Sequence, residues 1–187
     1  MIPIFEQGSG QGIGHGRAQF IKRFDEICTE HLEKKRARSF AFVFYDFNNK
    51  ALRKILRDQG VFAELDRISG KQLSLFYLHG GDRGAVESFN QNFLSVLGVE
   101  GTADLPCIVF FKVDAGNVTE VKVAQLDSAD LVHGFRELAG VVEEYLSSDK
   151  GGSVTRYIAI KWLKVGGEFV TAGAFSAILK KGIEYLF

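Results

Sequence analysis

The stretch of residues 105–113 constrains the fold more than any other part of the chain. It reads Leu-Pro-Cys-Ile-Val-Phe-Phe-Lys-Val, a proline followed by apolar and β-branched residues, which is the pattern of a buried strand. Proline has no amide hydrogen to give to a sheet, so it is tolerated at the first position of a strand and rarely further in. We therefore expect Pro106 at the lip of a sheet, where a cleft can form.

A second buried strand is predicted over residues 39–45, because this run is almost continuously apolar. Ligands of open α/β sheets bind beyond the carboxyl ends of strands, so the residues that follow this strand are informative. The candidate cleft comprises Asp46, Phe47, Asn48, Asn49, Pro106 and Cys107. The alternative is that Asp46, Asn48 and Asn49 only cap the next helix.

Hydrophobic periodicity and turn residues predict the remaining elements. Helices are expected over residues 17–35, 50–57, 61–69, 84–97 and 127–146, and further strands over residues 71–78 and 118–126. Alternating helices and strands favour parallel crossovers, whereas the turn Asp114-Ala115-Gly116-Asn117 predicts a closing antiparallel hairpin. The sequence therefore predicts an α/β protein with a mixed sheet.

The order of these elements, with the Leu105-Pro106-Cys107 turn, resembles the thioredoxin-like family. In that family a buried strand leads to the active-site helix, and a later strand opens with a cis-proline before a β-hairpin and a terminal helix. The resemblance implies a three-layer α/β/α fold with a mixed central sheet, β-α-β followed by β-β-α. It divides the chain into a glycine-rich arm (1–16), a thioredoxin-like domain (17–148) and a C-terminal apolar and basic helical appendage (149–187).

The chain departs from the family at the position of the redox motif. Family oxidoreductases carry two cysteines in a CxxC motif after the first buried strand, and this chain has Phe47-Asn48-Asn49-Lys50 there. Without a nucleophilic pair, dithiol exchange cannot run. The two cysteines, Cys28 and Cys107, lie far apart in the chain, and the apolar neighbours of Cys107 favour a packed thiol. A one-thiol redox or sensing role for Cys107 is the alternative.

Other enzymatic signatures are missing from the sequence. The four histidines, His15, His31, His79 and His133, have no metal-ligand spacing, and there is no nucleophile elbow. Glycines alternate from Gly8 to Gly16, which leaves open a phosphate cradle or a flexible or packing arm, but no P-loop ending follows. We therefore expect no cofactor, no metal and no catalytic residue.

The appendage combines apolar residues with six basic and two acidic residues from Lys150 to the end. It is too apolar to be left in water, so it is expected to pack on its own domain, on a protein partner or second copy, or on a membrane surface. It is read as two short helices or as a strand and a helix.

Charge and composition bound the partners. The formal net charge is zero, which gives no general attraction to nucleic acid. The start of the chain does not read as a signal peptide, and two isolated thiols suit a reducing compartment, so a cytoplasmic location is predicted. The sequence thus predicts a non-catalytic module that binds a protein partner or itself. Membrane association through the C-terminal segment is a second alternative.

Overall fold

The protein is described by a computed structural model covering residues 4–7, 13–15, 38–70, 72–78, 83–101, 103–114, 117–127, 131–149 and 161–164. Seven strands form one sheet in the order β2-β1-β4-β3-β5-β6-β7. The strands are β1 (Ile4–Gln7), β2 (Ile13–His15), β3 (Arg38–Phe44), β4 (Leu73–Leu78), β5 (Cys107–Asp114), β6 (Asn117–Gln125) and β7 (Lys161–Lys164). The described helices are α2 (Lys50–Ile55), α3 (Gln59–Ser69), α4 (Arg83–Val96) and α5 (Leu131–Asp149).

The sheet is mixed, as the sequence predicts. Strands β3 and β4 are parallel, and every other neighbouring pair is antiparallel. The predicted elements from residue 39 to residue 149 are present within a few residues of their expected bounds, and the α/β class is confirmed. The helix predicted over residues 17–35 lies outside the described residues, as do Cys28 and the tail beyond Lys164.

Three strands lie in segments for which the sequence analysis predicts no strand or leaves the choice between strand and helix open. Strands β1 and β2 form a hairpin within the glycine-rich arm, and β1 pairs with β4. Strand β7 comes from the appendage and pairs with β6, so this part of the appendage packs on its own chain. Strands added at a sheet edge are held by backbone hydrogen bonds, which leave little side-chain pattern to recognise in a sequence.

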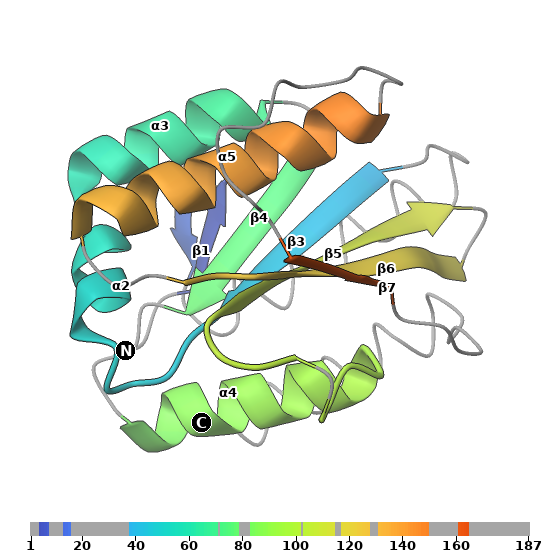
Figure 1. The fold of residues 1–187 in the computed structure, drawn as a ribbon, viewed down its shortest axis with the longest axis horizontal. Helices are drawn as coiled ribbons and strands as arrows, with labels where there is room; N and C mark the ends of the chain where they lie inside the picture. Colours follow the sequence, from blue (N-terminus) through green and yellow to red (C-terminus); the bar gives the residue numbers. More distant parts are fainter. Residues whose placement is uncertain are drawn as a thin grey trace.

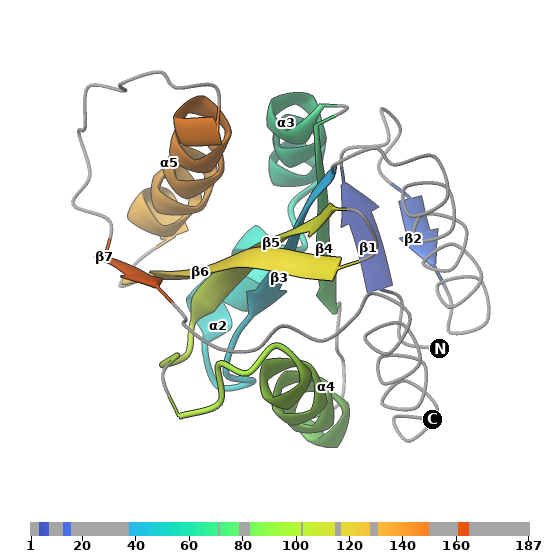
Figure 2. The same ribbon diagram turned by 90° about the vertical axis from the view of Figure 1, so that its right-hand side faces the viewer.

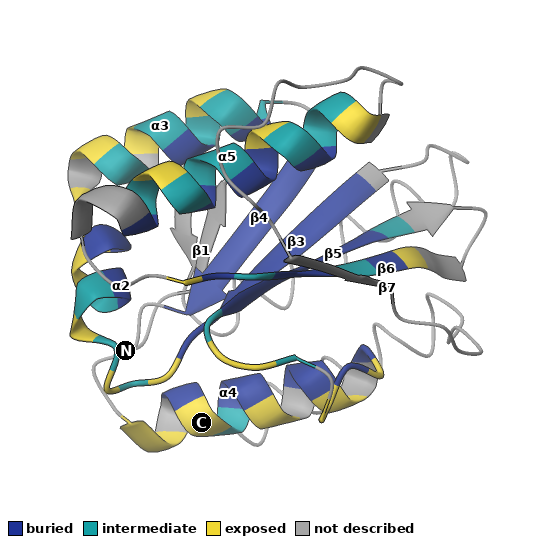
Figure 3. Ribbon diagram, viewed as in Figure 1, coloured by how far each residue is buried: buried dark blue, intermediate teal, exposed yellow. Residues whose placement is uncertain are grey.

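Helices cover both faces of the sheet. Helices α3 and α5 lie over one face, and α4 lies over the other (Figures 1 and 2). Figure 3 shows buried residues along the central strands and on the sides of α3, α4 and α5 that face the sheet. Strands β3 and β4 are buried on both faces, which explains their continuous apolar sequences.

Phenylalanine side chains fill the space between the sheet and α4, and Phe42 on β3 lies at the centre of this cluster. Its ring lies 5.0–6.3 Å, centroid to centroid, from the rings of Phe44, Phe76, Phe89, Phe93 and Phe111. Offset and tilted aromatic pairs at these distances contribute stabilisation beyond the area they bury. These rings come from β3, β4, β5 and α4, so one cluster joins four elements.

The opposite face packs against α5 through a different contact. The Tyr145 ring stacks on Phe110 of β5 at 4.2 Å, and the Tyr145 hydroxyl lies 3.2 Å from the Ser39 hydroxyl on β3. All three side chains are buried. A buried hydroxyl without a partner is costly, so this pair allows a tyrosine to close the core beneath α5.

None of the helices in the described part of the chain is both long and apolar enough to span a bilayer.

Replacing Phe42 by alanine is expected to lower the free energy of unfolding by about 3–5 kcal/mol, because five ring contacts are lost and a cavity is left. Replacing the exposed Leu105 by alanine should change it by less than about 0.5 kcal/mol. Urea denaturation followed by circular dichroism measures both. If Phe42→Ala unfolds the protein outright, Phe42→Leu gives a measurable intermediate loss. Equal effects at the two sites would contradict the role given to Phe42.

Candidate functional site

The structure brings Pro106 beside the segment that follows β3. Residues 46–49 and 103–106 are together called the corner. Cys107, the first residue of β5, is paired with Phe44, the last residue of β3, in the antiparallel register. Pro106 precedes Cys107 and therefore lies beside the chain that leaves β3 toward Asp46 and α2. The peptide bond between Leu105 and Pro106 is cis. The candidate residues predicted from the sequence are thus neighbours in space.

The segment between β3 and α2 is a compact turn that caps the helix. The Asp46 carboxylate accepts a hydrogen bond from the backbone N–H of Asn48 at 2.5 Å. The Asp46 carbonyl accepts one from the backbone N–H of Asn49 at 2.9 Å. Asn49 is the N-cap of α2, and its side-chain oxygen accepts a hydrogen bond from the Leu52 amide at 2.9 Å. Capping, the alternative raised by the sequence for Asp46, Asn48 and Asn49, is therefore made by Asn49, while Asp46 closes the turn before the helix.

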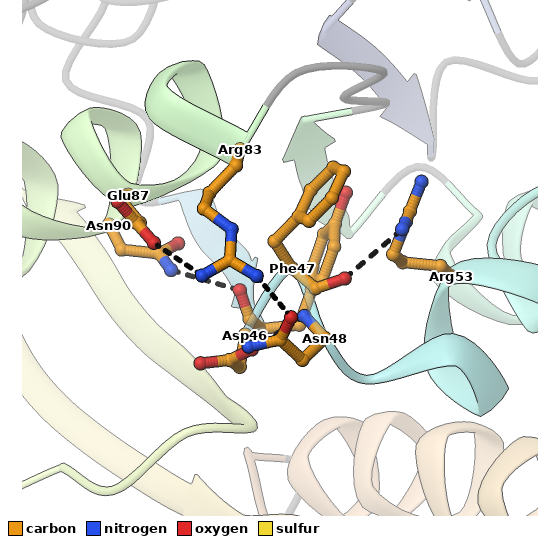
Figure 4. Close-up of polar contacts among 8 residues, drawn as sticks. Asp46, Phe47, Asn48, Arg53, Arg83, Glu87 and Asn90 are labelled. Carbon is orange, nitrogen blue, oxygen red and sulfur yellow. Dashed lines mark hydrogen bonds and ion pairs between the residues drawn. The ribbon is translucent and has the colours of Figure 1, made fainter.

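Two arginines hold the ring and backbone of Phe47 (Figure 4). The Arg53 guanidinium lies 3.9 Å from the ring centroid and donates a hydrogen bond to the Phe47 carbonyl at 3.1 Å. The Arg83 guanidinium lies 5.8 Å from the same centroid and donates to the Asn48 side-chain oxygen at 2.5 Å. Figure 4 shows the two arginines flanking Phe47, so the half-buried ring has little freedom to move.

Helix α4 ties the corner to the core. Asn90 donates to the Tyr45 carbonyl at 2.9 Å, and the Tyr45 hydroxyl donates to the Leu78 carbonyl at 2.6 Å. Arg83, on the first turn of the same helix, also faces Glu87 with 3.9 Å between their charged atoms. The sequence analysis did not assign Arg53, Arg83 or Asn90 to the site, because their side chains reach the corner only once the chain has folded. Asn90 on the apolar side of its predicted helix was the one available signal, since a buried amide needs a partner.

The loop before β5 presents Leu105 to solvent. The Gln125 side chain donates to the carbonyls of Asp104 and Pro106, at 2.6 and 3.0 Å, and the Leu126 amide donates to the Pro106 carbonyl at 3.0 Å. These bonds fix the backbone while the Leu105 side chain remains 37% exposed. Among the side chains that the structure describes, Leu105 is the exposed large apolar one. A single exposed apolar side chain is common on protein surfaces, so Leu105 is of interest here because it lies next to Pro106.

Cys107 lies in the predicted cleft by sequence position, but its side chain is not part of the surface. The residue is 0% exposed, and burial, followed by the nearby Asp104 carboxylate, raises the pKa of the Cys107 thiol to about 12. A nucleophilic cysteine needs an accessible thiolate, and this thiol is neither accessible nor ionised near neutral pH. The geometry therefore disfavours a redox role for Cys107.

The corner presents groups that can bind a second molecule. Over the described residues, no group of three or more His, Cys, Asp or Glu side chains is placed to hold a metal ion. The groups at the surface are the Asp46 carboxylate, the Asn48 amide, the Phe47 ring edge and the Leu105 side chain. This arrangement can make hydrogen bonds and apolar contacts with a second molecule.

In the folded protein, Cys107 is expected not to react with a thiol reagent such as 5,5′-dithiobis(2-nitrobenzoic acid) at pH 8, because the thiol is buried and protonated. The test uses a Cys28→Ser background, in which Cys107 is the remaining cysteine. Complete reaction is expected after unfolding in guanidinium. A Glu100→Cys variant in the same background supplies an exposed control thiol that reacts at once. Reaction of Cys107 at the control rate under native conditions would contradict the buried assignment.

The same thiol predicts a loss of stability at high pH. Unfolding returns the Cys107 pKa from about 12 toward its ordinary value of 9.0, so between these values the unfolded chain releases a proton that the folded chain keeps. The contribution is constant below pH 9 and falls by about 1.4 kcal/mol per pH unit above it. Urea unfolding from pH 8.5 to 10.5 should show a steeper decline for the Cys28→Ser protein than for the same protein carrying Cys107→Ala. Parallel declines would contradict the raised pKa.

Comparison of the chain with protein-family models, with curated proteins and with solved structures finds no match. What the protein does is therefore argued from the geometry of the corner itself.

Proposed function

We propose that this chain has a thioredoxin-like fold without dithiol chemistry, and that it serves as a non-catalytic module binding a protein segment at the corner formed by residues 46–49 and 103–106. The strand order β4-β3-β5-β6, with β3 parallel to β4 and the last two strands antiparallel, supports the fold assignment. The placement of α4 on one face and of α3 and α5 on the other agrees with a three-layer arrangement (Figure 2).

The observation that carries the proposal is the register of β3 and β5, which puts Pro106 beside the segment that leads from β3 into α2. In the thioredoxin-like family this is where the reactive cysteine pair faces the proline, and here Asn49 occupies the helix start as a hydrogen-bonded cap. An asparagine side chain engaged by the Leu52 amide cannot act as a redox nucleophile. The corner thus occupies the place of the family's redox site, but its residues are suited to binding another molecule.

The corner has the makeup of a small protein-binding surface. Leu105 is an exposed apolar centre, and the polar groups of Asp46 and Asn48 form part of a rim. Interfaces commonly place apolar anchors inside such a rim. The Arg53 and Gln125 hydrogen bonds hold the surrounding backbone, and the Arg83 hydrogen bond holds the Asn48 side chain, before any partner arrives. Binding to a held surface costs less conformational entropy than binding to a loose one.

The assignment leaves the source of the bound segment to be either a partner protein or a second copy. It also goes with a cytoplasmic location, because two isolated thiols suit a reducing compartment better than a disulfide scaffold does. No described contact favours membrane association.

A displayed library of random peptides, panned on the intact protein, tests the proposal. Peptides retained by the natural sequence are expected to bind Leu105→Asp at least tenfold more weakly, because a charge replaces the apolar anchor. Isothermal titration calorimetry measures the affinities. Glu143→Lys, an exposed charge change on α5, is the control and should bind as the natural sequence does. Peptides that bind all three proteins equally, or the absence of any enriched peptide, would remove the corner as a binding surface.

A further inference from the structure

A cleft separate from the corner lies among α2, α3 and α5. Its volume is about 560 Å³, and it is lined by Lys54, Ile55, Asp58, Gly60, Val61, Glu64, Phe135 and Arg136. Sites for small organic molecules in proteins span roughly 300–1,000 Å³. The cleft is therefore large enough for such a molecule, and α3 and α5, which contribute to its lining, lie on the sheet face opposite α4 (Figure 1).

The wall of the cleft is apolar where it meets the core. Ile55 is buried, and Val61 and Phe135 are half-buried against the hydrophobic core. One side chain comes from each of the three helices, so their packing creates the apolar surface. A ligand that fills this space must present hydrocarbon or an aromatic ring to it.

The two acidic residues at the rim have hydrogen-bond partners, and for Glu64 the partner is a cation. One Asp58 oxygen accepts hydrogen bonds from the Gly60 and Val61 amides, at 2.8 and 3.1 Å, as the N-cap of α3. Both Glu64 oxygens accept hydrogen bonds from the Arg67 guanidinium, at 2.5 and 2.8 Å. This bidentate contact also lowers the pKa of Glu64. Arg67 therefore offsets the charge of Glu64, whereas Asp58 keeps its charge as the cap of α3.

The two basic residues at the rim have no such partners. Within the described part of the chain, no ion pair or side-chain hydrogen bond engages Lys54 or Arg136. They come from α2 and α5, which pack against each other, and both side chains are exposed. The uncompensated charge around the cleft is therefore positive, although the rim carries two residues of each sign.

We propose that this cleft binds a small amphipathic organic anion, a carboxylate with an apolar body of the fatty-acid or aryl-acid class. The apolar body lies against Ile55, Val61 and Phe135, and the carboxylate lies at the rim between Lys54 and Arg136. The match of one apolar wall with two unpaired cations selects this class over a neutral lipid or an amine. The inference does not depend on the corner, because the two sets of lining residues are different.

Octanoate, octanol and octyltrimethylammonium, titrated into the intact protein, test the charge assignment. Octanoate is expected to bind in the millimolar range or tighter and at least fivefold more tightly than the other two compounds. Amide chemical shift changes in the labelled protein should cluster on α2, α3 and α5. Absence of octanoate binding at millimolar concentration, equal binding of the ammonium compound, or shift changes centred elsewhere would overturn the proposal.

Three variants locate the site. Lys54→Gln combined with Arg136→Gln should weaken octanoate binding about five- to tenfold and leave octanol binding unchanged, since the apolar wall is intact. Val61→Trp should abolish binding of both by filling the cleft, with thermal unfolding used to check that the variant folds. Lys50→Gln, a change of an exposed basic residue on α2 outside the cleft, is the matched control. Octanoate binding that is as tight in the double variant as in the natural sequence would overturn the assignment. If the protein self-associates and Val61→Trp abolishes that self-association, the cleft is instead an interface with a second copy of the chain.

Discussion

The packing of phenylalanine rings around Phe42 is the interaction on which the rest of the structure depends. Phe42 lies on β3, the strand that pairs with β4 on one side and β5 on the other. Its ring meets rings from both neighbours and from α4. Dense ring packing in a core leaves few alternative arrangements, because each ring occupies space that no neighbour can fill. The cluster thus sets the position of α4 relative to the sheet.

The geometry of the corner follows from this placement. Helix α4 carries Phe89 and Phe93 on its buried side, and it carries Asn90 and Arg83 toward the end of β3. A helix seated by its aromatic side chains therefore delivers two polar groups to the turn before α2. Residues far from the surface in this way determine whether the surface is ordered. The same logic applies to the cleft on the other face, whose wall exists because α2, α3 and α5 pack together.

The sequence predicted the central strands and helices well, because buried strands and amphipathic helices leave strong periodic patterns. The resemblance to the thioredoxin-like family led to the expectation that Pro106 lies near residues 46–49, and the pairing of Cys107 with Phe44 places Pro106 beside the segment that leaves β3. It could not predict the contact between Arg83 and Asn48, which are 35 positions apart, because an exposed arginine carries no record of its partner. The unpaired state of Lys54 and Arg136 was equally hidden. Strands β1, β2 and β7 were missed or left open, because they are short and their pairing depends on backbone atoms that all residues share.

The two outer strands also affect how copies of the protein meet one another. At one margin of the sheet, β2 is only three residues long, and at the other, β7 begins and ends with lysine. Short margins and repeated positive charge both discourage a foreign strand from extending the sheet, which is how many proteins avoid fibrillar aggregation. A chain with so much phenylalanine in its interior has particular need of this protection while it is being synthesised. The two surfaces proposed for recognition belong to turns and helices, where association can be specific and can stop at a defined complex.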